Sequence, residues 1–272
     1  MHLSDANQCV QPAMNLAGHE GHAPTANGTA LAPIPAWKRI LDVTLVLMAI
    51  PFLIPVGILV YAFIKIASPG PAFFRQQRVG YMCRRFMCLK FRTMKVNADT
   101  GVHRAHLKQL MTANQPTRKL DCAGDKRLIF GGMWLRATGL DELPQFFNVL
   151  RGDMSLVGPR PCVPYEFELY SEHHKQRCQT PPGMTGLWQV SGKNNTTFEQ
   201  MMDLDLKYVR EKSLWLDLKI MAWTVPAIMK LVWEMKIRPR IGMGPVERTV
   251  KPDAEFPAKA AVRLSGTVPA KD

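Results

Sequence analysis

The feature that most limits how this chain can fold is an apolar stretch from Val43 to Ile64, twenty-two residues without a charged side chain. As a straight helix it would span about 33 Å, close to the thickness of the hydrocarbon core of a bilayer. Pro51 and Pro55 lie within the stretch. Because each proline removes a backbone donor and clashes with the preceding turn, we expect the helix to kink near its middle.

Basic residues flank the apolar stretch on both sides. Lys38 and Arg39 precede it, and five more follow it: Lys65, Arg75, Arg78, Arg84 and Arg85. Cationic flanks favour the cytoplasmic side of a membrane. Two arrangements stay open at this point, a single span and a re-entrant helix that dips into one leaflet and returns to the same face.

Local patterns predict mostly helices and a short hairpin after this stretch. Residues 85–94 alternate loosely and predict a strand or hairpin arm. One helix is expected over residues 138–150, stopped by Gly152, because Thr138 has capping-box spacing to the acid three residues later. Further helices are expected to begin near Pro164 and over residues 197–211.

The stretch 214–235 is apolar and rich in tryptophan, yet it carries charged side chains and Pro226. Two interpretations stay open. It forms a buried core helix, or it forms a pair of amphipathic helices in the membrane interface, where tryptophan and lysine are favoured.

Positive charge is concentrated in one part of the chain. The formal net charge is +13, and residues 65–136 hold fifteen Lys or Arg against three Asp, a net charge of +12. Such a field attracts the phosphates of nucleic acid, of anionic lipid or of a nucleotide substrate. A nucleic-acid-binding protein is the main alternative, but the apolar stretch has no role there and few aromatic residues interleave the basic run.

The six cysteines lack any zinc-type spacing and are interpreted as reduced thiols.

Two adjacent acids, Asp141 and Glu142, form the first candidate site. Acids in a first helical turn can simply offset the helix dipole. Neighbouring helical positions point about 100° apart, so the two carboxylates cannot share one proton. One could attack a phosphorus atom while the other helps to hold Mg²⁺, which takes one or two protein carboxylates together with phosphate oxygens and water.

Arg160 lies between two prolines and forms the second candidate site. The prolines restrict its backbone, so its guanidinium is presented with little entropy left to lose. The planar fork of arginine matches phosphate bidentately. Lys90, Arg92 and Arg136 form a third set, cations that could neutralise a diphosphate as its bond breaks.

Taken together, these residues resemble the bacterial sugar transferases, monotopic polyprenyl-phosphate hexose-1-phosphate transferases that begin exopolysaccharide, O-antigen and glycoprotein glycan assembly. The resemblance runs from about Lys38 to Ile228. Ordered blocks carry it: Lys38-Arg39-x-x-Asp42, residues 70–76 (GPAFFRQ), 90–94 (KFRTM), 140–145 (LDELPQ), 152–161 (GDMSLVGPRP) and 182–192 (PGMTGLWQVSG).

The resemblance implies a two-step exchange. Asp141 attacks the β-phosphate of a nucleotide sugar, UMP leaves, and a covalent sugar-phosphate enzyme forms, from which a lipid phosphate takes the sugar phosphate. Glu142 is then the Mg²⁺ ligand. Family members also rely on cations that fall here at Lys90 and Arg136. Arg160 would hold phosphate, and Asp205 matches the acid of a D-x-x-Y pattern that contacts substrate.

The resemblance also implies a re-entrant helix, broken in the family at a Ser-Pro pair. The corresponding pair here is Ile54-Pro55, so the proline is present and the serine is not. A serine hydroxyl helps to satisfy the backbone groups that proline frees, so its loss puts the local geometry in question. Larger relatives carry several spanning helices before this core, and we expect this chain to be the minimal catalytic form.

The expected fold is α+β, mainly α, in a monotopic membrane protein. Residues 1–36 are expected to form a disordered polar tail without a cleavable signal peptide, 37–67 the re-entrant helix, 68–243 a catalytic domain with interfacial helices at the cytosolic face, and 244–272 a mobile tail. The expected partners are a UDP-hexose, undecaprenyl phosphate and the bacterial inner membrane, and not nucleic acid. Residues 191–197 are similar to those of members using UDP-glucose or UDP-galactose. A homodimer and a non-catalytic membrane-anchored scaffold stay open as alternatives.

Overall fold

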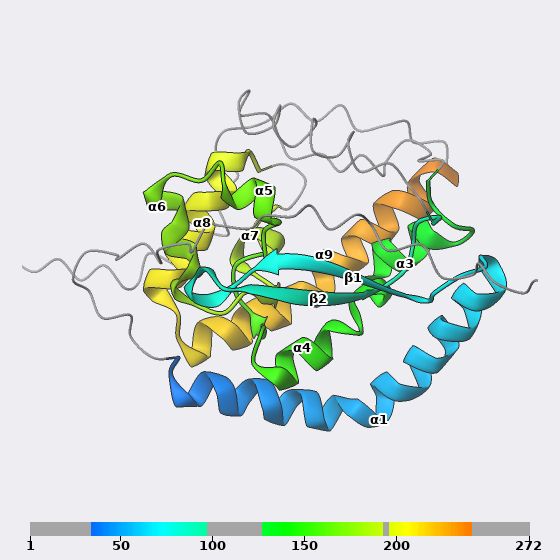
Figure 1. Ribbon diagram of the computed structural model, residues 1–272, viewed down its shortest axis with the longest axis horizontal. Coiled ribbons are helices and arrows are strands. Elements are labelled where there is room, and N and C mark those ends of the chain that lie inside the picture. Colours follow the sequence, from blue (N-terminus) through cyan, green and yellow to red (C-terminus); the bar gives the residue numbers. More distant parts are fainter. Residues whose placement is uncertain (1–33, 97–126, 193–195, 241–272) are drawn as a thin grey trace, which may run out of the picture. The chain divides into compact units, whose positions relative to one another are not determined.

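The computed structural model describes residues 34–96, 127–192 and 196–240, and the structural statements below refer to these residues. Most of the predicted N-terminal tail and the whole C-terminal tail lie outside them. The described chain is mainly helical, with two short pairs of strands (Figure 1). This confirms the predicted α+β class, mainly α.

The elements follow one another along the chain as α helices, β strands and 3₁₀ helices (η). They are α1 (Ala36–Ala67), β1 (Phe73–Val79), η1 (Tyr81–Cys83), β2 (Arg85–Phe91), α3 (Gly132–Thr138), η3 (Leu140–Glu142), α4 (Gln145–Arg151), β3 (Ser155–Val157), α5 (Pro164–Phe167), α6 (Glu172–Lys175), η4 (Gln176–Gln179), β4 (Gly183–Thr185), α7 (Leu187–Val190), α8 (Phe198–Glu211) and α9 (Leu214–Arg240).

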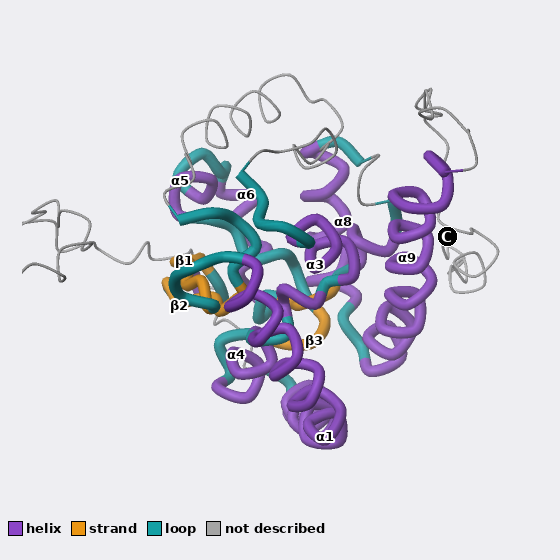
Figure 2. Tube along the Cα trace, turned by 90° about the vertical axis from the view of Figure 1, so that its right-hand side faces the viewer, coloured by secondary structure: helices purple, strands orange, loops and turns teal. Residues whose placement is uncertain are grey.

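Helix α1 is one helix of 32 residues that keeps both prolines inside it. It is long and apolar enough to cross a membrane, with a mean hydropathy of 2.7 in its most apolar window, of which only 11% is buried. Figure 1 shows α1 along the lower edge of the view, bending upward toward its C-terminal end. In Figure 2 it is seen end-on as the lowest element. Large apolar side chains are exposed along its length, among them Leu47, Met48, Phe52, Ile54, Ile58 and Leu59. A surface of this kind marks a membrane or protein contact.

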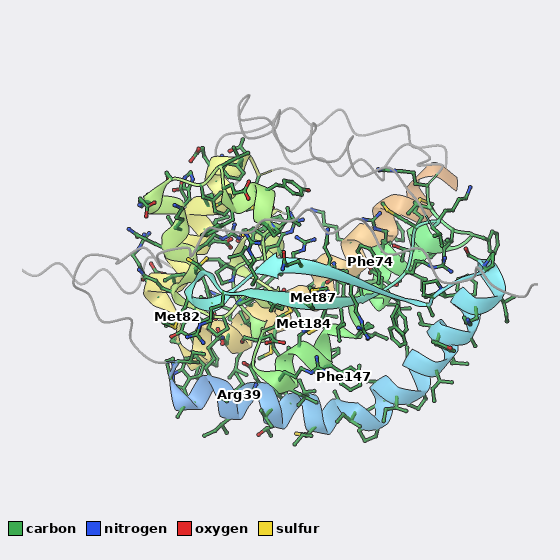
Figure 3. All side chains as sticks on the ribbon, viewed as in Figure 1. Arg39, Phe74, Met82, Met87, Phe147 and Met184 are labelled. Atoms are coloured by element: carbon green, nitrogen blue, oxygen red, sulfur yellow. The ribbon has the colours of Figure 1, made fainter. Side chains whose placement is uncertain are left out.

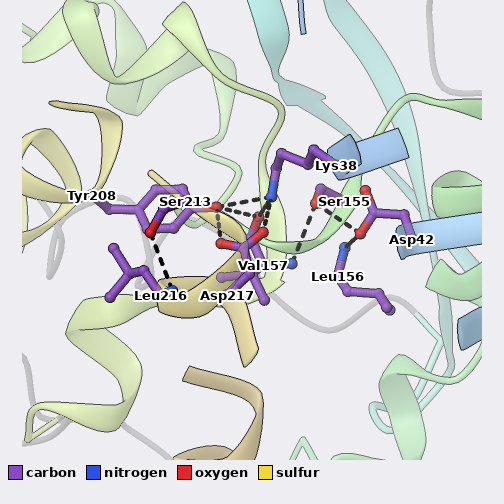
Figure 4. A network of polar contacts seen from close by, with 9 residues as sticks. All are labelled: Lys38, Asp42, Ser155, Leu156, Val157, Tyr208, Ser213, Leu216 and Asp217. Atoms are coloured by element: carbon purple, nitrogen blue, oxygen red, sulfur yellow. Dashed lines mark hydrogen bonds and ion pairs between the residues drawn. The ribbon is translucent and has the colours of Figure 1, made fainter. Parts of the chain in front are cut away.

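The start of α1 is held to the rest of the protein by a buried lysine (Figure 4). Lys38 is fully buried, and its Nζ donates to Val157 O at 2.9 Å, to the hydroxyl of Tyr208 at 2.8 Å and to Oδ2 of Asp217 at 2.6 Å. Of the two basic residues that precede the apolar stretch, Lys38 is therefore not exposed as a flanking charge. Its charge is paired inside the protein with an acid of α9.

Two further polar contacts join α1 to the segment around α4. The carboxylate of Asp42 accepts from the backbone N–H of Leu156 at 2.9 Å. The guanidinium of Arg39 donates to the carbonyls of Val149 and Leu150, which belong to the last turn of α4. A cation at this end of a helix satisfies carbonyls that have no partner within the helix. The block Lys38-Arg39-x-x-Asp42 thus attaches the first turns of α1 to the rest of the protein.

The strands β1 and β2 form an antiparallel hairpin, with Phe73 opposite Phe91 and Val79 opposite Arg85. The predicted hairpin arm over residues 85–94 is confirmed, although the strand ends at Phe91. The second pair, β3 and β4, is parallel. In the loop after β3 a Cβ on Gly158 would lie 2.3 Å from a carbonyl oxygen of the chain that leads into β4. Only glycine permits this close approach of two main chains.

The predicted helix over residues 138–150 is wrong in its first half only, because α4 spans Gln145–Arg151 and ends at Gly152 as expected. Thr138 is the last residue of α3 rather than a cap, and its Oγ1 donates to the carbonyl of Trp134 at 2.8 Å. Gly139 follows in the left-handed conformation with φ of 75°, which ends α3. Pro144 then begins the short helix α4. The two candidate acids therefore lie on a single 3₁₀ turn between two short helices, not at the N-terminus of a long one.

Local signals predicted α8 correctly. Thr197 accepts at its Oγ1 from the N–H of Gln200, whose side chain accepts from the N–H of Thr197 at 3.0 Å. α9 is one helix that continues through Pro226, not a helix pair. Its Ile220 is buried in the core, whereas Trp215 is 76% exposed and Trp233 53% exposed. The buried-core interpretation therefore holds for one face of α9, whereas a position of the other face in the membrane interface stays a prediction.

Candidate active site

The acids Asp141 and Glu142 form η3, which is held by apolar side chains on both sides of them. Leu140 and Leu143 pack into a cluster shared by α1, β2 and α3, whose buried members are Val60, Ile64, Ala72, Phe91, Ile129 and Leu135. Burial of such side chains is the main favourable term in fixing a short segment. The two acids are thereby anchored next to the C-terminal end of the apolar helix.

Lys90 of β2 contacts the second acid directly. Its Nζ lies 2.8 Å from Oε1 of Glu142, and the side chains are 24% and 35% exposed. Asp141 beside them is only 7% exposed. A partly exposed ion pair adds little to stability. It places a cation directly beside the second carboxylate, at a position that is partly exposed.

Two other predicted cations belong to, or directly follow, elements that pack against η3. Arg136 occupies the last turn of α3, which packs against η3. Arg92 is buried, and its terminal nitrogens donate to Ser68 O at 2.8 Å and Pro69 O at 2.9 Å. Arg92 thus ties the end of β2 to the loop that follows α1. Phosphate contact by Arg136 or Arg92 stays a prediction.

The turn that carries Arg160 is fixed at its backbone by two other arginines. Arg177 donates to the carbonyl of Arg160 at 2.8 Å, and Arg78 donates to the carbonyl of Pro161 at 2.9 Å. Arg160 lines a small hollow together with residues of two other segments, namely Gly80 of the hairpin turn and Cys178, Thr180 and Pro182. The expected rigid presentation of this arginine therefore has a visible cause.

Asp205 lies behind this turn. It is 1% exposed and forms an ion pair with Arg177, which is itself buried. Burial raises the pKa of Asp205 above its ordinary value, and the charge of Arg177 opposes that shift. Through Arg177 the carboxylate acts on the carbonyl of Arg160. Direct contact of Asp205 with substrate stays a prediction, and its observed partner gives it a positioning role.

One positioning residue was missed from the sequence. Asn148 of α4 is fully buried, and its side-chain amide accepts from the N–H of Leu89 at 3.0 Å and donates to the carbonyl of Met87 at 2.8 Å. It substitutes for a neighbouring strand along the open edge of β2, near the labelled Met87 in Figure 3. Because α4 follows the two acids directly, this contact fixes them relative to Lys90. An amide within the otherwise apolar run of residues 146–150 was the available signal.

We expect Asn148→Ala to lower both stability and activity. The substitution leaves the main-chain groups of Leu89 and Met87 without partners, which costs about 1–3 kcal/mol for each buried group. Chemical unfolding in detergent measures the first effect, and turnover of the remaining folded protein measures the second. Arg151→Ala, an exposed change on the same helix, is the control and should stay within about 0.5 kcal/mol. An Asn148→Ala protein as stable as the control would contradict this role.

A metal site built from protein ligands alone does not occur among the residues described. No three His, Cys, Asp or Glu side chains come together there. The two acids on η3 match the smaller protein contribution that Mg²⁺ needs when phosphate and water supply the other ligands.

The sequence matches the bacterial sugar transferase family over residues 34–231. The galactosyl transferase CpsE of Streptococcus agalactiae is 41% identical over 194 residues, which cover 71% of this chain and 42% of CpsE. The exopolysaccharide production protein ExoY of Sinorhizobium fredii is 40% identical over 198 residues, which cover 70% of this chain and 84% of ExoY.

A third relative is the UDP-glucose:undecaprenyl-phosphate glucose-1-phosphate transferase of Caulobacter vibrioides. It is 40% identical over 200 residues, which cover 71% of this chain and 69% of the relative. The chain thus spans less than half of CpsE and most of ExoY. The matched region contains all seven predicted site residues, from Lys90 to Asp205. The chain belongs to the bacterial sugar transferase family.

Proposed function

We propose that this protein transfers a hexose-1-phosphate from a UDP-sugar to undecaprenyl phosphate and releases UMP, as the first step in building an exopolysaccharide or related glycan. The observation that carries the proposal is the contact of Lys90 with Glu142 at 2.8 Å, beside Asp141 and at the end of an exposed apolar helix. Transfer to a lipid-linked phosphate needs acids and a cation that act on the phosphate, and it needs an apolar surface next to them that contacts the membrane.

In the first step an oxygen of Asp141 attacks the β-phosphorus of the UDP-sugar. A bond forms between this oxygen and phosphorus, the bond from phosphorus to the bridging oxygen breaks, and UMP leaves with that oxygen. In the second step an oxygen of the lipid phosphate attacks the same phosphorus. The bond to Asp141 breaks, the carboxylate is restored, and the lipid carries a diphosphate-linked sugar.

The remaining residues are assigned roles around this phosphorus. Lys90 and Arg136 balance the negative charge of the diphosphate as its bond breaks. The guanidinium of Arg160, on its rigid turn, binds a phosphate through two parallel hydrogen bonds. Glu142 would hold Mg²⁺ together with phosphate oxygens. When bound, the ion withdraws charge from the phosphate and makes UMP a better leaving group.

A plain hexose is the proposed sugar. CpsE is named a galactosyl transferase, and the Caulobacter relative is named for UDP-glucose and glucose-1-phosphate. The segment that resembles users of these two sugars, residues 191–197, lies partly outside the described residues. We therefore favour UDP-glucose or UDP-galactose over modified sugars.

An assay with a panel of UDP-sugars tests this function. The protein is reconstituted in membrane with undecaprenyl phosphate and Mg²⁺, and the released nucleotide is identified. UMP released with UDP-glucose or UDP-galactose supports the proposal. Release of UDP would indicate direct glycosyl transfer, and no release with any sugar would favour the scaffold alternative. Loss of membrane binding in high salt would instead favour the alternative of a basic nucleic-acid-binding protein, whose contacts are electrostatic and weaken with salt.

We also propose that α1 is re-entrant at the cytoplasmic face of the inner membrane. Near its start Val46 packs with Val149 and Met154, and near its end Val60 and Ile64 pack into the cluster beside the acids. Both ends of α1 therefore contact the same water-exposed unit, while the apolar middle is uncovered. A helix that crosses the bilayer would put its two ends on opposite sides.

This topology predicts that tags on both termini stay cytoplasmic. Protease added to the outside of spheroplasts should cleave neither an N-terminal nor a C-terminal tag, whereas protease added to inverted vesicles should remove both. A periplasmic marker protein, digested in the first preparation, is the control. Cleavage of the N-terminal tag from outside would show that α1 crosses the membrane.

A further inference from the structure

Three cysteines gather at the turn of the β1–β2 hairpin. Cys162 and Cys178 are buried in one apolar cluster, and Cys83 is partly buried against it. The labelled Met82 marks this turn in Figure 3. The fourth cysteine of the described residues, Cys88, belongs to a different apolar cluster, which includes Val46 of α1.

Two of the three thiols lie on turns that pack against each other. Cys83 packs against the apolar cluster that contains Cys178, and η1, which carries Cys83, packs against η4, which carries Cys178. Cys162 lies outside both turns, and its main chain pairs with Val79 of β1. Cys83 and Cys178 are therefore the two thiols that the packing of η1 against η4 brings together.

The backbone at Cys83 is held in an uncommon conformation. Met82 and Cys83 both lie in the left-handed region, with φ of 53° and 58°, although neither is glycine or asparagine. This conformation is unfavourable for residues other than glycine. It is maintained by hydrogen bonds around the turn, including Cys83 N to Gly80 O at 3.1 Å. Backbone strain of this kind is commonly retained at functional segments.

The environment also separates the two thiols chemically. The hydrogen bond from Cys178 lowers the pKa of Cys83 to about 7, and the positive charge of Lys175 favours the same shift. The same contact and burial raise the pKa of Cys178. Cys83 is thus the more exposed and more acidic of the two thiols, and Cys178 is buried, which is the arrangement of an attacking and a resolving cysteine.

We propose that Cys83 and Cys178 form a reversible disulfide that responds to hydroperoxides and loosens the turn carrying Arg160. The Cys83 thiolate attacks a peroxide oxygen, the O–O bond breaks, and a sulfenic acid forms with release of hydroxide or alkoxide. The Cys178 sulfur then attacks the sulfenic sulfur, and water leaves with the thiol proton. A dithiol reductant reverses the step by thiol–disulfide exchange.

Arg177, the residue before Cys178, connects the proposed disulfide to the turn that carries Arg160. Arg177 holds the carbonyl of Arg160 and pairs with Asp205. Disulfide formation brings the two sulfurs to about 2.05 Å from each other, which draws η4 toward η1 and displaces Arg177. This consequence rests on the proposed function, in which Arg160 holds a substrate phosphate. The expected result is a several-fold higher KM for the UDP-sugar in the oxidised protein.

Peptide mapping tests the disulfide directly. The full chain, reduced and reconstituted in detergent, is treated with a small excess of hydrogen peroxide, alkylated and digested with trypsin without reductant. Each of the six cysteines falls in a different tryptic peptide, with Cys83 in residues 79–84 and Cys178 in residues 178–193. A mass equal to these two peptides joined is expected, and it should disappear on reduction.

The control variants separate this pair from the other thiols. Cys178→Ser should abolish the joined peptide and leave Cys83 as a sulfenic acid that dimedone traps, while Cys88→Ser should leave the joined peptide unchanged. Oxidation that joins other cysteines, or none, overturns the proposal whether or not the protein is a transferase. A joined peptide without any change in KM overturns the connection to Arg160.

Discussion

Asp141→Asn is expected to abolish the exchange of labelled UMP into the UDP-sugar. The amide has nearly the shape of the carboxylate but no anionic oxygen. It therefore cannot attack the β-phosphorus, and the covalent intermediate does not form. We expect a loss of at least about 10³-fold, the scale seen when a nucleophile is removed. Incubating the enzyme with UDP-sugar and labelled UMP, without lipid phosphate, measures the first step alone.

Asp203→Asn is the matched control for this experiment, because Asp203 is exposed on α8. Its exchange rate should equal that of the unaltered protein. Thermal unfolding of both variants shows whether they fold normally. Asp141 is 7% exposed and the substitution conserves its volume, so a folded but inactive protein is expected. Unchanged exchange by Asp141→Asn would refute the assignment of the nucleophile.

Lys38→Met is expected to destabilise the protein more than any other single change considered above. It removes the cation from a pair in which Lys38 is 0% and Asp217 1% exposed, and it leaves the carboxylate buried without its charge partner. Such a change typically costs about 3–5 kcal/mol. For a chain of this size the midpoint of thermal unfolding should fall by roughly 6–20 °C. Calorimetry or fluorescence in detergent measures this shift.

Two further variants separate the buried pair from salt bridges in general. Lys175→Met breaks the exposed pair with Glu172, whose side chain is 83% exposed, and should change stability by no more than about 0.5 kcal/mol. Lys38→Met combined with Asp217→Leu removes both charges and should recover much of the loss, because the uncompensated charge is gone. If Lys38→Met were as mild as Lys175→Met, the buried network would not hold α1.

Local rules predicted the elements whose signals lie within a few residues of one another. The capping box at Thr197 and Gln200 gave the start of α8. The absence of charge from Val43 to Ile64 gave the long apolar helix, whose start at Ala36 lies one residue from the expected one. Such signals are local because helix caps and hydrophobic runs act on their own neighbours.

The predicted start of the helix over residues 138–150 was wrong because two signals competed. The spacing from Thr138 to Asp141 favoured a cap, but Gly139 takes the left-handed conformation and Pro144 starts a new helix. Glycine next to a potential cap fits a helix end as well as a helix start. The error mattered for the site, because it placed the acids on a helix rather than on a tight turn.

Contacts between residues far apart in the chain could not be predicted. Lys38 meets Asp217 across 179 positions, and the sequence offered only a cation beside an apolar stretch. The same holds for Asn148, which serves β2 from 59 positions away. Lys90 and Glu142 were named as candidate site residues from the sequence and then from the family resemblance, whereas their contact is a result of the fold. Residue types could therefore be predicted, while partners depended on tertiary packing.

The chemistry at Asp141 can be tested most directly by the mass of the peptide that carries it. The protein is mixed with its UDP-sugar and Mg²⁺ without lipid phosphate, quenched in acid and digested, which places Asp141 in the tryptic peptide of residues 137–151. We predict a hexose phosphate on this peptide, located to Asp141 by fragmentation and removed when undecaprenyl phosphate is added. UMP released in step with product while this peptide stays unmodified would contradict a covalent intermediate.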